Sequence, residues 1–382
     1  ALELLNELVN VWFDNAKEQF ITALKIGILM PFSFAIKQKF QSEKGFLPWL
    51  YIYGVKDSGK TTTGEIILHI FGVYDDVHKK GKGQIDSEAK LGNELAIDTF
   101  PHLINESSQI FTKPSLVEII KQAVEGFIAR ERYENKNVLK EFPALAPLII
   151  TANEKMPIND EALTQKRFII IRYPLKARLD REKITEFREK VAPRLPRLKA
   201  LGEFIEWYLV NNPEELTYDW INLSKKLLEE AYKYAEVTPT WDIGLIYVDT
   251  DDYDVRVDIV SVIWKKIVEA YNKKVEIVYD NGNYTTAVNR LAILESVLES
   301  GALGFLIKRN DEVLITRGIL DVLKDEGIEV DSLPSLAELF AEYGMEYTDR
   351  KVLGKTKKVL VIKLEGLERL FNEFFNSADN LE

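Results

Sequence analysis

The stretch "WLYIYGVKDSGKTTTGEIILHIFG", Trp49 to Gly72, decides the expected fold. Its apolar, aromatic first part predicts a buried strand that ends at Gly54, and the residues from Thr61 onward predict a helix. The loop between them, from Gly54 to Thr61, matches the pattern G-x-x-x-x-G-K-[ST] without a mismatch. A strand, a glycine-containing loop and a helix in this order are typical of a site that holds the phosphates of a nucleotide.

Each residue type in this loop has a physical role toward a triphosphate. The glycines allow backbone N–H groups to point at phosphate oxygens. Lys60 supplies a positive charge for the β- and γ-phosphates, and Thr61 offers a hydroxyl to Mg²⁺. The sequence therefore predicts ATP and Mg²⁺ as cofactors. The residues expected to bind them are Gly54, Asp57, Ser58, Gly59, Lys60, Thr61 and Thr62.

Hydrolysis of a bound triphosphate also needs a carboxylate near the γ-phosphate, where it activates water. The apolar run "FPHLI" predicts a strand that leads to Asn105 and Glu106. We expect Glu106 to be the catalytic base and, together with Thr61, to hold Mg²⁺. Asn105 stands where an aspartate commonly supports the metal, a departure that could weaken metal binding. Asp98, in "LAIDTF", is a competing candidate for the carboxylate.

Two further strands carry polar residues at their ends. The run "PLIITAN" predicts a buried strand that ends at Asn153, which could orient the attacking water or simply cap a turn. In "LTQKRFIIIRYP", Lys166 and Arg167 stand immediately before another predicted strand. A cation there could reach the γ-phosphate bound by a neighbouring subunit, as an arginine finger, with Arg167 as the catalytic candidate. A solvated basic pair is the alternative interpretation.

Composition limits the possible chemistry. The 382 residues include no cysteine, which excludes disulfides, thiolate metal sites and a cysteine nucleophile. The three histidines are scattered along the sequence, so we expect no zinc site. A net charge of −11 argues against a surface that binds nucleic acid everywhere, but it leaves room for a local basic channel. The most apolar stretch, Ile26 to Ile36, is too short to span a bilayer, so we expect no membrane contact.

Four regions are expected along the chain. Residues 1–45 form an N-terminal helical segment, 46–176 an α/β core with a mostly parallel sheet, and 177–247 a helical region. Residues 248–382 form a C-terminal domain in which a helix precedes two strands around a basic turn, the pattern of a winged helix. The acidic stretch 247–258 is expected to be a linker or loop. Since the chain starts within an amphipathic pattern, we interpret it as a fragment of a larger cytoplasmic protein.

Taken in order, these motifs resemble the superfamily 3 helicases over roughly residues 40–180. The resemblance rests on the phosphate loop, "EAKLGNEL", the strand that ends in Glu, "EGFIARERYENKNVLKEF", "IITANEKMP" and "KRFIIIRYP". The most similar branch is that of phage, poxvirus and plasmid primase-helicases, which are AAA+-related ATPases that form hexameric rings and translocate on single-stranded DNA. The resemblance implies an AAA+-like core, a homo-oligomeric, hexameric ring, single-stranded or forked DNA as partner, and a covalently linked primase or other N-terminal domain.

In that family a hairpin between the Glu strand and the Asn strand faces the central channel. Here the hairpin segment is "GFIARERYENKNVLKEF", and the resemblance implies that Arg130, Arg132 and Lys136 contact DNA phosphates. Tyr133 would be available for stacking on a base. A solvated amphipathic strand, with glutamates balancing the charges, is the alternative. The basic residues around the wing turn could likewise bind DNA or a neighbouring subunit.

The expectation is therefore a ring-forming, ATP- and Mg²⁺-dependent helicase motor of a plasmid or viral replication protein. The abundance of Lys, Glu and Ile is the bias of hyperthermophiles, which suggests an archaeal source. Three other classes remain open. They are a minichromosome-maintenance-like or other AAA+ replication factor or initiator, a slow nucleotide-dependent switch or scaffold, and a P-loop kinase.

Overall fold

A computed structural model describes most of the chain and divides it into two units, Ala1–Asp249 and Thr250–Glu382. The described residues are 1–81, 83–135, 138–157, 163–247, 253–278, 290–326, 328, 330, 332–352 and 354–378. Of the residues in the hairpin segment 132–139, only the strand backbone is described, without side chains.

A five-stranded parallel sheet forms the centre of the first unit. Its strands are β1 (Trp49–Gly54), β2 (Lys79–Lys80), β3 (His102–Ile104), β6 (Leu148–Ala152) and β7 (Phe168–Tyr173). Their order is β2-β3-β6-β1-β7, and each neighbouring pair runs parallel. The prediction of a mixed α/β core with a parallel sheet is confirmed. Because all strands run the same way, their carboxyl ends meet at one edge, which is where such sheets bind ligands.

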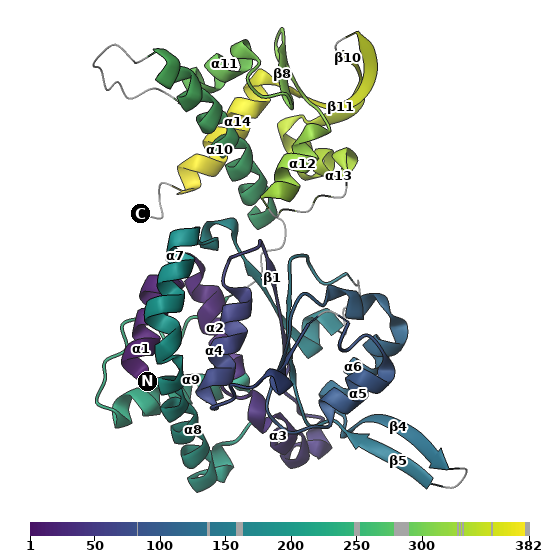
Figure 1. The fold of residues 1–382 in the computed structure, drawn as a ribbon, viewed down its shortest axis with the longest axis vertical. Coiled ribbons are helices and arrows are strands. Elements are labelled where there is room, and N and C mark those ends of the chain that lie inside the picture. The colour runs from purple at the N-terminus through teal and green to yellow at the C-terminus, as the bar shows by residue number, and fades with distance from the viewer. Residues whose placement is uncertain are drawn as a thin grey trace. The chain divides into compact units, whose positions relative to one another are not determined.

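Alternate residues of β1 serve two separate cores. Leu50 and Ile52 pack into one core together with helices from both ends of this unit, whereas Tyr51 and Tyr53 pack into the other. The first face is covered by α1 (Leu2–Glu7), α2 (Lys17–Gly27), α4 (Lys60–Ile70), α8 (Lys199–Asn211) and α9 (Trp220–Tyr234). The second is covered by α5 (Glu88–Leu95) and α6 (Pro114–Glu125), and Figure 1 shows the two groups on opposite sides of the sheet.

The segment Asp14–Lys39 is long and apolar enough to cross a membrane by length and composition, and 72% of its most apolar window is buried within the protein. It contains α2 and α3 (Ser33–Lys39), which are separated by a turn at Pro31. Two lysines in it are buried, and each ammonium group meets backbone carbonyls. Lys25 donates to the carbonyl of Ile243 at 3.0 Å, and Lys37 donates to three carbonyls at 2.7–3.0 Å. The segment therefore packs here as a pair of core helices.

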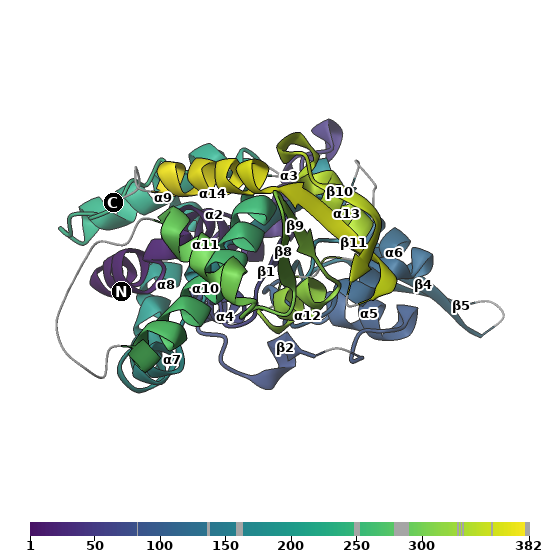
Figure 2. The ribbon, with the colours of Figure 1, turned by 90° about the horizontal axis from the view of Figure 1, so that it is seen from above.

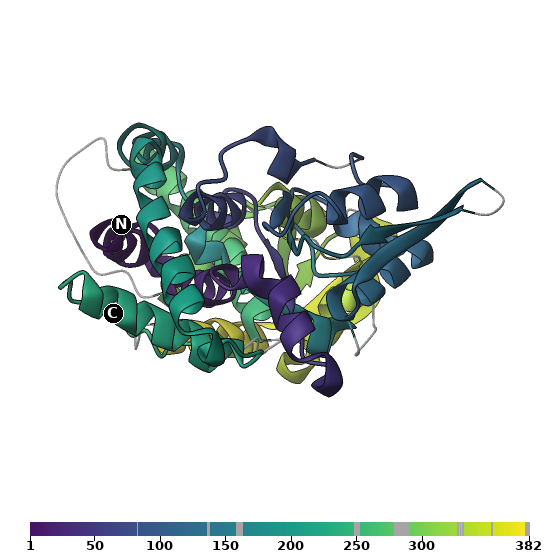
Figure 3. The ribbon, with the colours of Figure 1, turned by 90° about the horizontal axis from the view of Figure 1, so that it is seen from below.

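An antiparallel hairpin, β4 (Ile128–Asn135) and β5 (Val138–Pro143), forms a separate two-stranded sheet between α6 and β6. Figures 1, 2 and 3 show it projecting away from the parallel sheet and its helices. Lys37 fixes its base, because the carbonyls that it meets belong to Ala123, Gly126 and Ala144, on both sides of the hairpin. Since β5 leads into the amino end of β6, the hairpin starts from the edge of the sheet opposite the phosphate loop.

The second unit is built on a four-stranded antiparallel sheet of order β10-β11-β9-β8. The expected helix followed by a hairpin is present as α13 and β10–β11, while assignment to the winged-helix class stays a prediction. The linker prediction is wrong for residues 253–258, which begin a long helix whose inner side is apolar. The elements are α10 (Tyr253–Val278), α11 (Arg290–Ser300), β8 (Leu306–Arg309), β9 (Glu312–Ile315), α12 (Gly318–Asp325), α13 (Leu333–Leu339), β10 (Glu346–Val352), β11 (Lys355–Lys363) and α14 (Leu364–Ala378).

Candidate nucleotide site

The loop between β1 and α4 has a backbone that two glycines make possible. Gly54 has φ 141° and Gly59 has φ 89°, values that side-chain-bearing residues rarely adopt. A Cβ atom on Gly54 would also lie 2.3 Å from the carbonyl oxygen of Tyr173, on the neighbouring strand β7. The loop is held on its outer side by a hydrogen bond from the Leu179 N–H to the Asp57 carbonyl, at 3.0 Å. The chain thus turns sharply at the carboxyl end of a central strand and enters α4 directly.

Lys60, the first residue of α4, directs its ammonium group into this loop. Its Nζ donates to the carbonyl oxygens of Gly54 at 2.8 Å and Val55 at 2.5 Å, and the residue is only 7% exposed. Burial lowers the pKa of Lys60 to about 8, against the opposing effect of the negative charges of Asp57 and Glu106. The side chain is therefore protonated at neutral pH, and its positive charge lies inside the loop.

Asn105 joins the phosphate loop to the neighbouring strand β6. Its Oδ1 accepts hydrogen bonds from the hydroxyls of Thr61 at 3.0 Å and Thr151 at 2.7 Å. Its N–H donates to the Lys80 carbonyl at 2.8 Å, which fixes the backbone beyond β3. Because the Thr61 hydroxyl donates its hydrogen bond to Asn105, the lone pairs of the Thr61 oxygen face elsewhere and remain able to bind a hard cation.

Three strand ends contribute to one cavity of about 440 Å³. Glu106 follows β3, Asn153 follows β6, and the phosphate loop follows β1, so the polar residues predicted from separate motifs line a common space. Glu106 is exposed and has φ 54°, a conformation that is uncommon for a residue with a side chain and occurs at functional sites. The predicted residues that line the cavity are Asp57, Ser58, Gly59, Lys60, Thr61, Thr62, Glu106 and Asn153.

Asp98, the competing carboxylate, lies outside this cavity. Its side chain accepts from the Phe100 N–H at 2.8 Å and contacts the imidazole of His78, also at 2.8 Å. The residues that line the cavity include Glu106 and not Asp98. Of the two candidate carboxylates, Glu106 is therefore the one that lines the cavity with the Gly54–Thr61 loop.

The opposite wall of the cavity is apolar and was not foreseen in the sequence. Trp12 and Phe13 come from the N-terminal segment and Phe187 from the helical region, where η9 (Phe187–Val191) is a short π-helix. The rings of Trp12 and Phe187 meet edge to face, with centroids 5.2 Å apart. Leu179, Ile184, Ala192 and Leu195 extend this surface. A cavity with a cationic, hydroxyl-rich side and an aromatic side has the two surfaces that a nucleotide requires.

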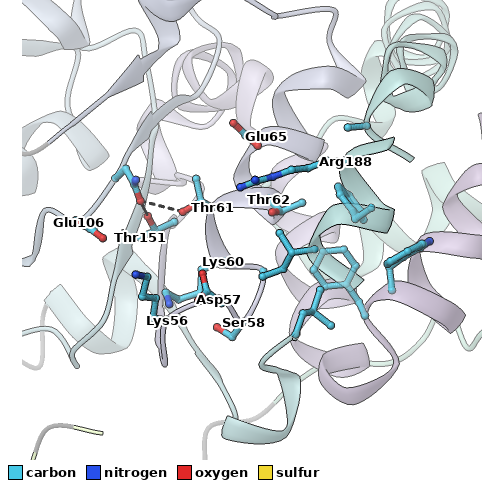
Figure 4. A pocket seen from close by; sticks show the side chains of 18 of the residues that line it. Lys56, Asp57, Ser58, Lys60, Thr61, Thr62, Glu65, Glu106, Thr151 and Arg188 are labelled. Carbon is cyan, nitrogen blue, oxygen red and sulfur yellow. Dashed lines mark hydrogen bonds between the residues drawn. The ribbon is translucent and has the colours of Figure 1, made fainter. Parts of the chain in front are cut away.

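Arg188 is a second unpredicted contributor to the cavity. In Figure 4 its side chain extends between Glu65 and Thr62, across from the phosphate loop. It belongs to the helical region after the sheet, about 130 residues beyond Lys60 in the sequence. No local motif marks this arginine, so only the folded chain reveals that it faces the same space as the loop.

Arg167 lies at the edge of the sheet formed by the amino ends of the strands, opposite the edge that carries the Gly54–Thr61 loop. It ends η7 (Leu163–Arg167) directly before the amino end of β7, and its guanidinium forms an ion pair with Glu125 at 2.9 Å. It is not among the residues that line the cavity of its own subunit. An arginine in this position could reach a nucleotide only in another copy of the chain. Its role as an arginine finger therefore stays a prediction.

Of the predicted DNA contacts, Arg130 is the one whose side chain is described. It lies near the base of β4 and is half-buried. Its aliphatic stem packs against Gly92 of α5, where a Cβ added to the glycine would lie 3.0 Å from Cδ of Arg130. The side chain of Arg132 and all of Lys136 lie outside the described residues. On β5, the Lys140 ammonium lies 5.6 Å from the centre of the Phe142 ring.

Comparisons with known proteins establish no family for the chain. No family model matches it, and no curated protein matches it. A solved structure described as "SCCmec type IV Cch - active helicase" is similar at 14% sequence identity and a TM-score of 0.38, over 94% of this chain and 70% of that chain. A likeness of this size carries no conclusion about activity, so the function is proposed below from the chain's own residues.

Proposed function

We propose that this chain is an ATP- and Mg²⁺-dependent DNA translocase of the helicase type that works as a ring. The observation that carries the proposal is the convergence on one cavity of the loop after β1, the carboxylate after β3 and the amide after β6. These three groups are those that hydrolysis of a nucleoside triphosphate requires: a phosphate cradle, a base and a group that orients water.

The residues around Thr61 fit a magnesium ion. Mg²⁺, if bound there, would supply positive charge that neutralises phosphate oxygens. The Thr61 hydroxyl donates a hydrogen bond to Asn105 Oδ1 at 3.0 Å, which leaves its oxygen lone pairs available to the ion. Thr151, which is 1% exposed, donates to the same amide oxygen and holds it in place. Glu106 adds a carboxylate at the same edge of the sheet.

We propose the following roles in turnover for the residues of this cavity. Lys60 and the backbone N–H groups of the loop hold the β- and γ-phosphates, Glu106 accepts a proton from the attacking water, and Asn153 orients that water. Arg188 faces the cavity from the helical region and supplies a further cation in the same subunit. The aromatic wall of Trp12 and Phe187 receives the base and ribose.

The DNA part of the proposal rests on the hairpin β4–β5 and on Arg167. The hairpin projects away from the sheet and carries the basic residues Arg130, Arg132 and Lys136 in its sequence. Arg167 does not line the cavity of its own subunit, so its predicted catalytic role requires a neighbouring subunit, which a ring would supply. Hydrolysis between subunits would then move the hairpins and the DNA that they hold.

The rate of ATP hydrolysis, measured with and without single-stranded DNA, tests this function. We expect DNA to stimulate the wild-type rate several-fold, and Lys60→Ala and Glu106→Gln to abolish turnover. Lys176→Ala, which removes an exposed lysine outside the cavity, is the matched control and should behave as wild type. Unchanged turnover in Lys60→Ala would overturn the nucleotide site, whereas slow turnover indifferent to DNA would favour a nucleotide-dependent switch.

Mixing two inactive variants tests the shared site separately. Lys60→Ala and Arg167→Ala subunits each lack one half of a site. In a mixed ring a complete site forms where an Arg167→Ala subunit binds the nucleotide and a Lys60→Ala neighbour supplies the arginine, which is about one interface in four for random mixing. Recovery of hydrolysis on mixing supports action in trans. Failure to recover, in a mixture that size-exclusion chromatography shows to be assembled, would contradict the role of Arg167.

A further inference from the structure

Two of the three histidines meet at the amino ends of β2 and β3. Lys79 pairs with Leu103 in the parallel ladder, so His78, immediately before β2, and His102, the first residue of β3, occupy the preceding positions. Their ring centroids lie 4.6 Å apart. The 23 residues between them in the sequence concealed this contact, which is the reason why scattered histidines predicted no metal site.

Both imidazoles turn their Nε2 atoms toward one carboxylate. Nε2 of His78 lies 2.8 Å from Oδ2 of Asp98, and Nε2 of His102 lies 3.7 Å from Oδ1 of the same residue. The ligand atoms of the three residues lie within 4.8 Å of one another. His102 is fully buried, and among the described residues its Nε2 has no hydrogen-bond partner. A buried nitrogen aimed at a carboxylate without a hydrogen bond calls for a cation between them.

The other nitrogen of each ring is held by a carboxylate of its own. Nδ1 of His78 lies 2.7 Å from Asp75, and Nδ1 of His102 lies 2.6 Å from Glu94. In His102 this contact places the proton on Nδ1 and leaves the Nε2 lone pair directed at Asp98. Nε2 of His78 lies at hydrogen-bond distance from Asp98, and a bound metal ion would take the place of its proton. Histidines that bind metals are almost always supported in this way, since the carboxylate fixes the ring and makes the ligating nitrogen more basic.

The charges around the cluster also favour a cation. Three carboxylates surround the two rings, and the Lys80 ammonium lies 3.7 Å from one of them, that of Glu94. The side chain of Asp98 is 30% exposed, which gives an ion a route from solvent and leaves a position for water. Two imidazoles and a carboxylate suit zinc and the first-row ions with similar preferences, whereas Mg²⁺ and Ca²⁺ prefer oxygen ligands.

We propose that His78, Asp98 and His102 bind one zinc-class divalent ion, with Asp75 and Glu94 supporting the two imidazoles. The site is separate from the Mg²⁺ position proposed at Thr61. His102 and Asn105 stand three residues apart on and after β3, about 10 Å along a strand. The ion would therefore fix the edge of the sheet, β2 to β3, whose far end presents Asn105 and Glu106 to the nucleotide cavity.

Metal binding by the purified full chain tests this inference without any measurement of hydrolysis. The protein is stripped with EDTA, dialysed, and titrated with Zn²⁺ by calorimetry and with Co²⁺ by visible absorption. We expect one equivalent to bind with saturation. Asp98→Asn and His102→Gln should abolish it, and Glu94→Gln should weaken it about 10- to 100-fold. His69→Gln, which changes the third histidine outside the cluster, is the matched control and should retain the full equivalent.

Two results would overturn the proposal. One is the absence of a saturable equivalent in the wild-type chain, which would mean that a proton alone occupies the space between the rings and Asp98. The other is equal uptake by Asp98→Asn and wild type, which would mean that the ion binds elsewhere. Since His102 is buried, circular dichroism of each variant must first match wild type. Asp98→Asn, at a partly exposed position, supplies the decisive comparison if His102→Gln fails to fold.

Discussion

Replacing Asn105 by aspartate tests how the phosphate loop holds a metal ion. The amide Oδ1 lies 3.0 Å from the Thr61 hydroxyl, and Mg²⁺ binds oxygen at about 2.1 Å, so the new charge would lie about 5 Å from the ion. Between a unit charge and a divalent ion at this distance, Coulomb attraction is about 1.7 kcal/mol even at the dielectric constant of water. Asn105→Asp should therefore tighten Mg²⁺ binding about tenfold.

The substitution preserves the local hydrogen bonds, which makes the result easy to interpret. A carboxylate still accepts hydrogen bonds from the hydroxyls of Thr61 and Thr151, so the fold should change little. The assay is the Mg²⁺ concentration that gives half-maximal ATP hydrolysis at fixed ATP. Asn93→Asp adds the same charge at an exposed position on α5, outside the cavity, and should leave that concentration unchanged. An unchanged or higher value in Asn105→Asp would refute the placement of the ion beside Thr61.

Three other substitutions follow from specific contacts. Gly54→Ala should destabilise the fold by about 3 kcal/mol or more in denaturant unfolding, because φ is 141° and its Cβ would clash with the Tyr173 carbonyl. Gly81→Ala is the control and should not, since its Cβ would meet only Gln84 Oε1, at an ordinary contact distance of 3.8 Å. Since burial lowers the pKa of Lys37 from 10.5 to about 8, the folded chain binds fewer protons than the unfolded chain between these values. The free energy of unfolding should therefore rise with pH across this window by up to about 3 kcal/mol. Lys37→Met should lack this rise, and the same rise in that variant would contradict the assignment to Lys37. Phe187→Ala should raise the KM for ATP about five- to tenfold with little change in kcat, and a fall in kcat alone would argue against a base-binding role.

Local sequence predicted the groups that stand next to strand ends. The loop from Gly54 to Thr61 is a contiguous motif, and Glu106 and Asn153 each follow a short apolar run, so each could be placed without knowledge of the rest of the fold. The parallel sheet then brings these three ends to one edge, because parallel strands share a direction. The phosphate side of the cavity was predictable for this reason.

The apolar side of the cavity depends on long-range packing and was not predictable in the same way. Trp12 and Phe187 are separated by most of the first unit, and both read as ordinary core residues at helical spacing. Arg188 has no motif around it. Their convergence follows from the packing of the N-terminal and post-sheet helices on the same face as α4, which no single segment encodes.

The histidine cluster shows the same limit. His78 and His102 lie far apart in the sequence and lack the short spacing of familiar metal motifs. They meet because β2 and β3 pair in parallel register, and Asp98 joins them from the preceding loop. A carboxylate that competed for the catalytic role in the sequence thus lies in a different site.

Strand displacement on a forked DNA substrate tests the central claim most directly. The measurement follows the release of a labelled strand by the full chain in the presence of ATP and Mg²⁺, alongside Glu106→Gln, which should bind ATP and leave the fork intact. We predict ATP-dependent displacement by wild type and none by this variant. Wild-type chain that hydrolyses ATP at the same rate with and without DNA and releases no strand would contradict the account.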